Sequence, residues 1–265
     1  LFTCTATNLP ILYQGAIPIF CDISKNNLNM NVDDIEGLIT EKTKAVTVVD
    51  YGGVPNNYKK LRNICDKYNL KLISDCAHCL DGEYRHKRIH EWSDFTIYSF
   101  QAIKTMTTGD GGMLICSNVT DEKLAKKIRW FGIDRQKKQQ GIWENDVLEL
   151  GFKYHMNDIA ASIGIASLEE IEKTLKRRRQ IFSRYKKNLK NIEYKIFENN
   201  QYNSNFTPWL LTLNCGEKRI DLMNNLRKNG IESAQVHYRN DRYSIFGKQN
   251  KNFKNMDAIE DSYLV

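Results

Sequence analysis

Residues 70–79 read LKLISDCAHC, and this stretch decides the class of fold. Residues 70–74 form a short, largely apolar run that is typical of a buried strand, and Asp75 follows it directly. A β-branched run at residues 45–49 precedes it, and residues 57–68 between the two runs have the spacing of an amphipathic helix. Strand, helix and strand in alternation predict an α/β fold with a mainly parallel sheet.

Further elements are predicted on both sides of this unit. Strands are expected at residues 17–21, 95–100 and 113–117, and a helix at residues 31–39 with Asn31 as its cap. Residues 158–189 carry apolar side chains at helical steps, which indicates one or two long amphipathic helices. After residue 200 we expect strands at 209–213 and 233–238 around a helix at 219–229 that Gly230 ends. This pattern predicts a large domain over residues 1–190, including the long connecting helix, and a small α+β domain over residues 191–265.

The composition favours a folded protein in a reducing compartment. The chain has 265 residues, of which 41% are hydrophobic, and this is enough for a sizeable core. We find no apolar run of about 18 residues and no signal peptide, so no membrane association is expected. The seven scattered cysteines favour free thiols and a cytoplasmic location over a disulfide scaffold. Both ends, at Leu1 and Val265, read as the interior of a domain, so we expect the chain to be truncated at each end.

One lysine stands in a setting that suits a nucleophile. Residues 98–112 read YSFQAIKTMTTGDGG, with Lys104 among apolar and small polar residues before a glycine-rich turn. A partly desolvated lysine loses its proton more readily, and a neutral amine attacks aldehydes. The alternative is an ordinary surface lysine that precedes a hairpin turn.

The end of the strand at residues 70–74 offers further chemistry. Burying the Asp75 carboxylate at this strand end costs free energy unless a cation pairs with it, and a protonated pyridine nitrogen could be that cation. Alternatively, Asp75 caps the following helical segment. Ligands of α/β sheets bind at the carboxyl ends of strands, where Asp75 and Ser99 both fall. Cys76 and Cys79, with His78 between them, also allow a redox or metal site, although no second ligand pair with suitable spacing follows.

The chain contains seven short motifs in a characteristic order: GAIPIFCDI at 15–23, DDIE at 33–36, ITEKTKA at 39–45, DCAH at 75–78, SFQAIK at 99–104, GDGG at 109–112 and GFKYHMNDI at 151–159. Their order and spacing resemble those of the DegT/DnrJ/EryC1/StrS family of sugar aminotransferases over nearly the whole chain. The resemblance implies the aspartate aminotransferase type I fold, with a three-layer, mainly parallel sheet of the pyridoxal phosphate transferase type and a small α+β C-terminal domain.

The same resemblance implies pyridoxal 5'-phosphate as the cofactor and gives roles to single residues. Lys104 would bind the cofactor covalently and shuttle a proton, Asp75 would pair with the pyridinium nitrogen, His78 would lie near the ring, and Ser99 would bind the phosphate. Lys153 would reach the phosphate of the partner subunit's cofactor, because these enzymes build their sites across a homodimer.

Two departures from the family pattern concern the cofactor. Cys4 stands at the cofactor-binding position where the family usually has an aromatic residue that stacks on the ring. The family's phosphate-binding turn lies upstream of Leu1, so we expect about sixty further residues before it, judged from the usual size of such a domain.

The resemblance also implies the substrates: an amino-acid donor, expected to be L-glutamate, and a nucleotide-linked keto-deoxy sugar of the kind used in polysaccharide biosynthesis. Arg135 could meet a diphosphate or carboxylate, with domain packing around Trp130 as the alternative. His237 and Arg239 lie where the small domain of such enzymes approaches the sugar, with a polar loop as the alternative.

Two rival functions stay open. Some relatives are dehydratases or cofactor-binding sensors, but histidine replaces the catalytic lysine in the dehydratases, so Lys104 favours amino transfer. The net charge of +7 and the basic residues within 173–190 suggest a nucleic-acid partner. Apolar residues at helical spacing within this run favour a solvated helix face, so we expect no nucleic acid.

Overall fold

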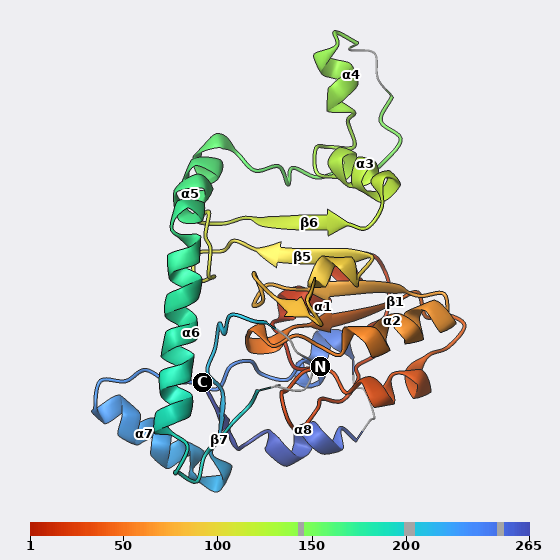
Figure 1. The fold of residues 1–265 in the computed structure, drawn as a ribbon. Coiled ribbons are helices and arrows are strands. Elements are labelled where there is room, and N and C mark those ends of the chain that lie inside the picture. The colour runs from red at the N-terminus through yellow and green to blue at the C-terminus, as the bar shows by residue number, and fades with distance from the viewer. Residues whose placement is uncertain (143–145, 199–204, 248–251) are drawn as a thin grey trace.

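The computed structural model describes residues 1–142, 146–198, 205–247 and 252–265. Its centre is a four-stranded sheet in the order β1 (Ala45–Val49), β2 (Lys71–Asp75), β5 (Phe95–Ser99) and β6 (Gly112–Cys116). The first three strands are parallel, and β6 pairs with β5 in the antiparallel direction at one edge (Figure 1). The predicted α/β fold with a mainly parallel sheet is therefore confirmed.

The register of the sheet places the ends of three strands beside one another. Val49 pairs with Asp75, and Asp75 pairs with Ile97. Ser99 follows two residues later on β5, so Asp75 and Ser99 lie at the same edge, as predicted.

Helix α2 (Tyr58–Lys67) joins β1 to β2 and packs on the sheet. The Asn57 side chain caps it by accepting a hydrogen bond from the backbone N–H of Lys60. Leu61 and Cys65 on its inner face are fully buried and share a hydrophobic cluster with Leu72 of β2. This cluster fixes the strand whose last residue is Asp75.

The remaining helices include a long pair beside the sheet. Helix α5 (Asp158–Glu169) and helix α6 (Ile171–Asn188) confirm the helical prediction for residues 158–189, and α6 runs from the level of β6 to that of α7 (Figure 1). The other elements are α1 (Thr5–Tyr13), α3 (Val119–Ile128), α4 (Arg135–Gln139), α7 (Arg219–Lys228), α8 (Lys254–Ile259), the hairpin β3 (Glu83–Tyr84) and β4 (Lys87–Arg88), and a small antiparallel sheet of β7 (Lys195–Ile196), β8 (Leu213–Asn214) and β9 (Tyr263–Leu264). Short 3₁₀ helices lie at Tyr51–Gly53, Ile89–Glu91, Gly216–Lys218, Asn240–Arg242 and Ser244–Phe246.

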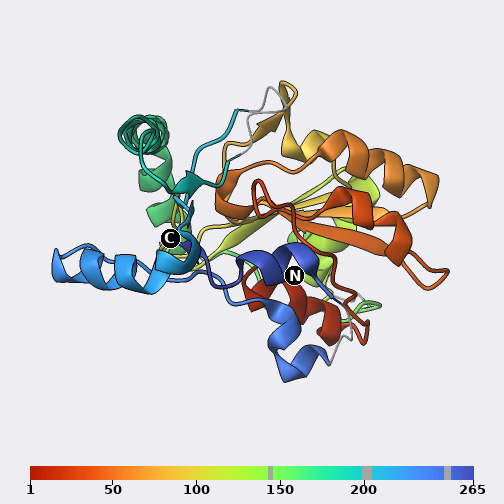
Figure 2. The same cartoon turned by 90° about the horizontal axis from the view of Figure 1, so that it is seen from below.

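The two ends of the chain share a second hydrophobic cluster. Phe2 and Phe20 from the N-terminal region pack with Phe246, Phe253 and Met256 from the C-terminal region. Figure 2 shows these red and blue segments side by side near the N-terminus. Packing thus crosses the expected boundary at residue 190, and the division into two domains stays a prediction.

Four predicted elements differ from the structure. Residues 17–21 form no regular secondary structure, and residues 31–39 form two 3₁₀ helices, Val32–Asp34 and Glu36–Leu38. The Asn31 side chain bonds the Asp34 carboxylate, so it leaves the backbone N–H groups uncapped. Of the strand expected at residues 209–213, only Leu213 pairs, as the first residue of β8. Of the strand expected at residues 233–238, only Ala234 pairs, with Val265. An apolar run makes a strand only where a partner edge is free.

No helix in the described part of the chain is long and apolar enough to cross a membrane.

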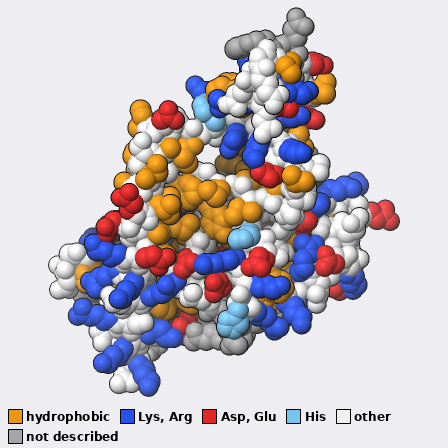
Figure 3. Space-filling view, turned by 45° about the horizontal axis from the view of Figure 1, so that its top comes forward, with side chains coloured by type: hydrophobic (Ala, Val, Ile, Leu, Met, Phe, Trp, Pro, Cys, Tyr) orange, Lys and Arg blue, Asp and Glu red, His pale blue; other side chains and the backbone are white. Residues whose placement is uncertain are grey.

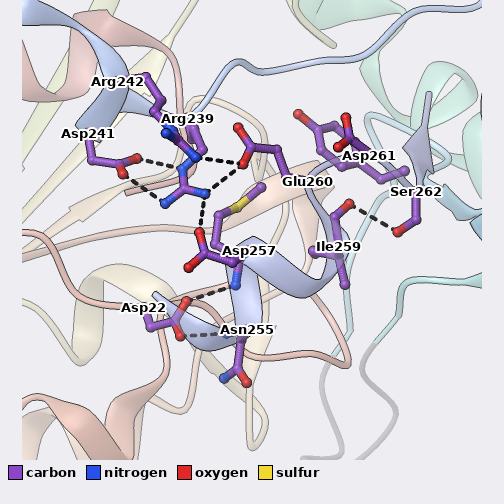
Figure 4. A network of polar contacts seen from close by, with 12 residues as sticks. Asp22, Arg239, Asp241, Arg242, Asn255, Asp257, Ile259, Glu260, Asp261 and Ser262 are labelled. Carbon is purple, nitrogen blue, oxygen red and sulfur yellow. Dashed lines mark hydrogen bonds and ion pairs between the residues drawn. The ribbon is translucent and has the colours of Figure 1, made fainter. Parts of the chain in front are cut away.

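A buried ion network ties the C-terminal region together (Figure 4). The Arg239 side chain is 2% exposed and bonds the carboxylates of Asp241, Asp257 and Glu260. Arg242, which is half exposed, also contacts Glu260. The network therefore joins the segment after residue 238 to helix α8.

We expect Arg239→Ala to lower the free energy of unfolding by about 3–5 kcal/mol, because it removes a buried cation and leaves the buried carboxylate of Asp241 and the partly exposed ones of Asp257 and Glu260 unpaired. Arg242→Ala is the matched control and should cost less than about 1 kcal/mol, since its ion pair is exposed. Urea denaturation of the two variants measures both values. Equal losses would show that the network contributes no more than a surface ion pair.

Candidate functional site

Lys104 lies in the turn between β5 and β6, in the glycine-rich stretch that the sequence singled out. Its Nζ atom lies 3.9 Å from the centroid of the Trp209 indole. Partial burial lowers the pKa of Lys104, against the opposing electrostatic effects of Asp75 and Cys4. The amine is thus less protonated than that of a surface lysine and is a stronger nucleophile.

Asp75 ends β2 and lies within electrostatic range of Lys104. Its Oδ2 atom accepts a hydrogen bond of 2.7 Å from the Thr7 hydroxyl, and its Oδ1 atom accepts one of 3.0 Å from the backbone N–H of Ala77. A carboxylate has about four acceptor positions. Asp75 can therefore accept a further hydrogen bond from a cationic N–H group.

Two uncharged histidines flank the amine. Burial, with a smaller effect of Lys104, lowers the pKa of His78 to about 2 and that of His237 to about 4. The rings of His78 and His237 are nearly parallel, with centroids 5.6 Å apart. The backbone N–H of Gly52 donates to Nδ1 of His78, which places the proton of this neutral ring on Nε2. The site therefore holds imidazoles rather than imidazolium ions at neutral pH.

Trp209 is a site residue that the sequence reasoning missed. Its ring stacks on His78 with centroids 4.0 Å apart, and its indole N–H donates to the carbonyl of Ile103, next to Lys104. Its backbone N–H bonds the carbonyl of Gly52. The only sequence signal was an aromatic residue in a strand-like run, which does not distinguish a core residue from a site residue.

The structure brings five of the predicted site residues together: Lys104, Asp75, His78, Cys4 and His237. Asp75 and Cys4 raise the pKa of Lys104, and Lys104 in turn lowers the pKa of His78 and of His237. Cys4 is exposed and immediately precedes helix α1. Ser99, at the end of β5, is partly exposed and accepts a weak hydrogen bond from the backbone N–H of Gln101.

Three predicted site residues lie elsewhere. Lys153 is exposed and forms an isolated bridge with Trp130, and Arg135 begins α4, which extends away from the sheet, with its guanidinium over the Trp130 ring (Figure 1). Arg239 is held by three carboxylates in the network of Figure 4. Its donors bind protein groups, so this placement gives no support to a substrate contact by Arg239.

The redox and metal alternatives for Cys76 and Cys79 find no support. Burial raises the pKa of both thiols well above the usual range, and both donate hydrogen bonds, to the Asp50 carboxylate and the Gly53 carbonyl respectively. Buried, protonated thiols are unreactive. The described residues also contain no cluster of potential ligands that could hold a metal ion.

The described residues fit pyridoxal 5'-phosphate. The cofactor requires an amine that is easily deprotonated, and Lys104 provides one. It also requires an acceptor for its protonated ring nitrogen, and Asp75 has acceptor positions left for this purpose. The fit rests on these two groups and on the neutral His78 beside them.

Curated relatives point in the same direction. The chain is 34% identical over 232 residues to the GDP-perosamine synthase of Escherichia coli O157:H7, covering 86% of this chain and 61% of the relative. It is 31% identical over 244 residues to a UDP-4-amino-4,6-dideoxy-N-acetyl-beta-L-altrosamine transaminase of Campylobacter jejuni, covering 89% and 63%. The chain thus spans less than two thirds of the length of these relatives.

Solved structures share the fold. The sugar aminotransferase CalS13 from Micromonospora echinospora superposes with a TM-score of 0.92 at 28% identity, over 99% of this chain and 72% of that one. Spr1654 from Streptococcus pneumoniae, solved in a PLP form, superposes with a TM-score of 0.87 at 25% identity, over 99% and 73%. The family model for these enzymes matches residues 1–264. The chain therefore belongs to the DegT/DnrJ/EryC1/StrS aminotransferase family.

Proposed function

We propose that the protein is a pyridoxal phosphate-dependent aminotransferase that moves an amino group from an amino acid, with L-glutamate as the expected donor, to a nucleotide-linked keto-deoxy sugar. The observation that carries this proposal is the partly buried amine of Lys104, with its lowered pKa, within electrostatic range of the strand-end carboxylate of Asp75. The relatives named as a transaminase and as a perosamine synthase support the sugar substrate.

When bound, the cofactor supplies an aldehyde for condensation with an amine and a protonated ring that withdraws electrons. Lys104 would bind this aldehyde and, once the donor's amine displaces it, would carry a proton as a general base. Asp75 would hold the proton at the ring nitrogen. His78, kept neutral by burial, would pack near the ring without adding positive charge.

The phosphate would be bound by groups from two chains. In this proposal Ser99 contributes its hydroxyl from the end of β5, and Lys153 reaches the site of a second subunit. The exposed position of Lys153 suits a contact outside its own chain. Cys4, beside Lys104, would lie against the cofactor where relatives have an aromatic ring.

A homodimer would also cover apolar side chains that are exposed in the single chain. Figure 3 shows hydrophobic side chains gathered on one face. Met113 of β6 and Ile159 and Ile165 of α5 are each more than half exposed. Contiguous apolar surface of this kind marks interfaces. Ile159 follows Lys153 by six residues in the chain.

The two rival functions fit less well. On α6, Lys173, Arg179 and Lys186 form ion pairs with acidic residues, so part of the basic run is already neutralised. The dehydratase alternative would require histidine at the position that carries Lys104.

All seven cysteines are free thiols, which suits the proposed cytoplasmic location.

Borohydride reduction of the complete protein with pyridoxal phosphate should label one lysine, Lys104, as mapped by peptide mass spectrometry. Lys104→Gln should abolish the label, whereas Lys153→Gln should keep it at saturating cofactor. Because burial lowers the pKa of Lys104, labelling should reach its plateau at a lower pH than for a free lysine. A label on another lysine would overturn the assignment.

Asp75→Asn should lower kcat for amino transfer about a hundredfold, because the neutral amide cannot stabilise the charged ring nitrogen. Reduction should still label Lys104, since that bond does not depend on the carboxylate. Asp66→Asn, on the exposed face of α2, is the control and should leave kcat unchanged. Wild-type turnover by Asp75→Asn would exclude the proposed role.

Coexpression of Lys104→Gln and Lys153→Gln subunits tests the shared site. Each variant alone should be nearly inactive at limiting cofactor. Random pairing makes half of the dimers mixed, each with one intact site of two, so about a quarter of wild-type activity should return. No recovery in dimers shown to be mixed would place Lys153 in the site of its own chain, and full activity of Lys153→Gln alone would place it outside any site.

A further inference from the structure

Two threonines connect the N-terminal helix to the strand-end carboxylate. The Thr7 hydroxyl lies 2.7 Å from Oδ2 of Asp75, and the Thr3 hydroxyl lies 2.8 Å from that of Thr7. Thr3 is 4% exposed and Thr7 is partly buried. The roles given above to Lys104, Asp75 and His78 use neither hydroxyl.

The direction of these hydrogen bonds follows from simple counting. A hydroxyl has one proton, and an ionised carboxylate can only accept. Thr7 must donate to Asp75, so it has no proton left for Thr3, and Thr3 must donate to Thr7. The two bonds therefore run in one direction, and each polarises the next.

The C-terminal region holds these threonines in place. The Asn240 side-chain amide donates to the carbonyl of Thr3, and its oxygen accepts a hydrogen bond of 2.9 Å from the side chain of Asn8. Asn240 is fully buried, and its neighbour Arg239 is the centre of the ion network in Figure 4. Both ends of the segment that carries the hydroxyls, Thr3 and Asn8, are thus fixed.

We propose that the Thr7 hydroxyl is a positioning residue that sets the rotation of the Asp75 carboxylate so that its free lone pairs face the ring nitrogen of the cofactor. Ala77 binds one carboxylate oxygen and Thr7 binds the other, so the plane of the group cannot turn. The inference rests on the proposed function, because it assumes that Asp75 binds this cofactor.

The test uses the complete protein as Thr7→Val, Thr7→Ser and Thr3→Val variants. Valine has the shape of threonine without the hydroxyl, and serine keeps the hydroxyl. Thr5→Val, on the same helix, is the control for a general effect of altering α1. The quantities to measure are the dissociation constant for pyridoxal phosphate, the pH dependence of the bound cofactor's absorbance, and kcat and KM for the amino donor.

Thr7→Val should weaken cofactor binding about tenfold, the size expected for one hydrogen bond to a charged group, and should shift the absorbance titration. Kcat should fall while KM for the donor changes little. Thr7→Ser should stay within about twofold of wild type, and Thr3→Val should show a smaller effect in the same direction. A merely structural role would change stability without moving the absorbance titration.

Wild-type affinity and titration in Thr7→Val would overturn the inference while leaving the proposed function intact, provided that borohydride still labels Lys104. Equal effects of Thr5→Val and Thr7→Val would overturn it as well. If Thr7→Val does not fold, the comparison of Thr3→Val with Thr5→Val decides in the same way. If wild-type protein is not labelled, the proposed function fails and this inference fails with it.

Discussion

The site depends on a balance between desolvation and charge at one amine. Partial burial opposes the protonated form of Lys104, and the nearby Asp75 carboxylate favours it. Burial has the larger effect, so the pKa is lowered and the amine stays reactive. A carboxylate much closer to the amine would reverse this balance and leave a protonated, unreactive group. In the proposed mechanism, the Asp75 carboxylate must therefore be close enough to bind the same cofactor as Lys104 without forming an ion pair with the amine.

The sheet and the aromatic cluster together set this balance. Adjacent parallel strands bring Asp75 and the turn after Ser99 to one edge, and Trp209 covers one side of the Lys104 amine. His78 and His237 line the site without adding charge, because burial keeps both rings neutral. Asp75 and the turn that carries Lys104 thus come from adjacent strands, whereas Trp209 comes from a distant part of the sequence.

Sequence patterns predicted what local order determines. Buried strands, the long helical region and the positions of Lys104 and Asp75 all follow from runs of a few residues and their ends. Trp209 and Thr7 were missed because their contacts span 106 and 68 positions and leave no local pattern. Arg239 was expected near substrate because charge in a loop does not reveal whether carboxylates from elsewhere will surround it. The strand expected at residues 17–21 was wrong because apolar alternation does not supply a partner edge.

The contact between Asn8 and Asn240 joins residues 232 positions apart. At roughly ten residues per second, the ribosome synthesises Asn240 many seconds after the helix at residues 5–13. During that interval β1, β2 and α2 can already pack, since their contacts lie close together in the chain. The nascent chain would therefore carry a formed sheet, and the part of the proposed cofactor pocket that depends on Thr7 would be completed only once Asn240 has left the ribosome.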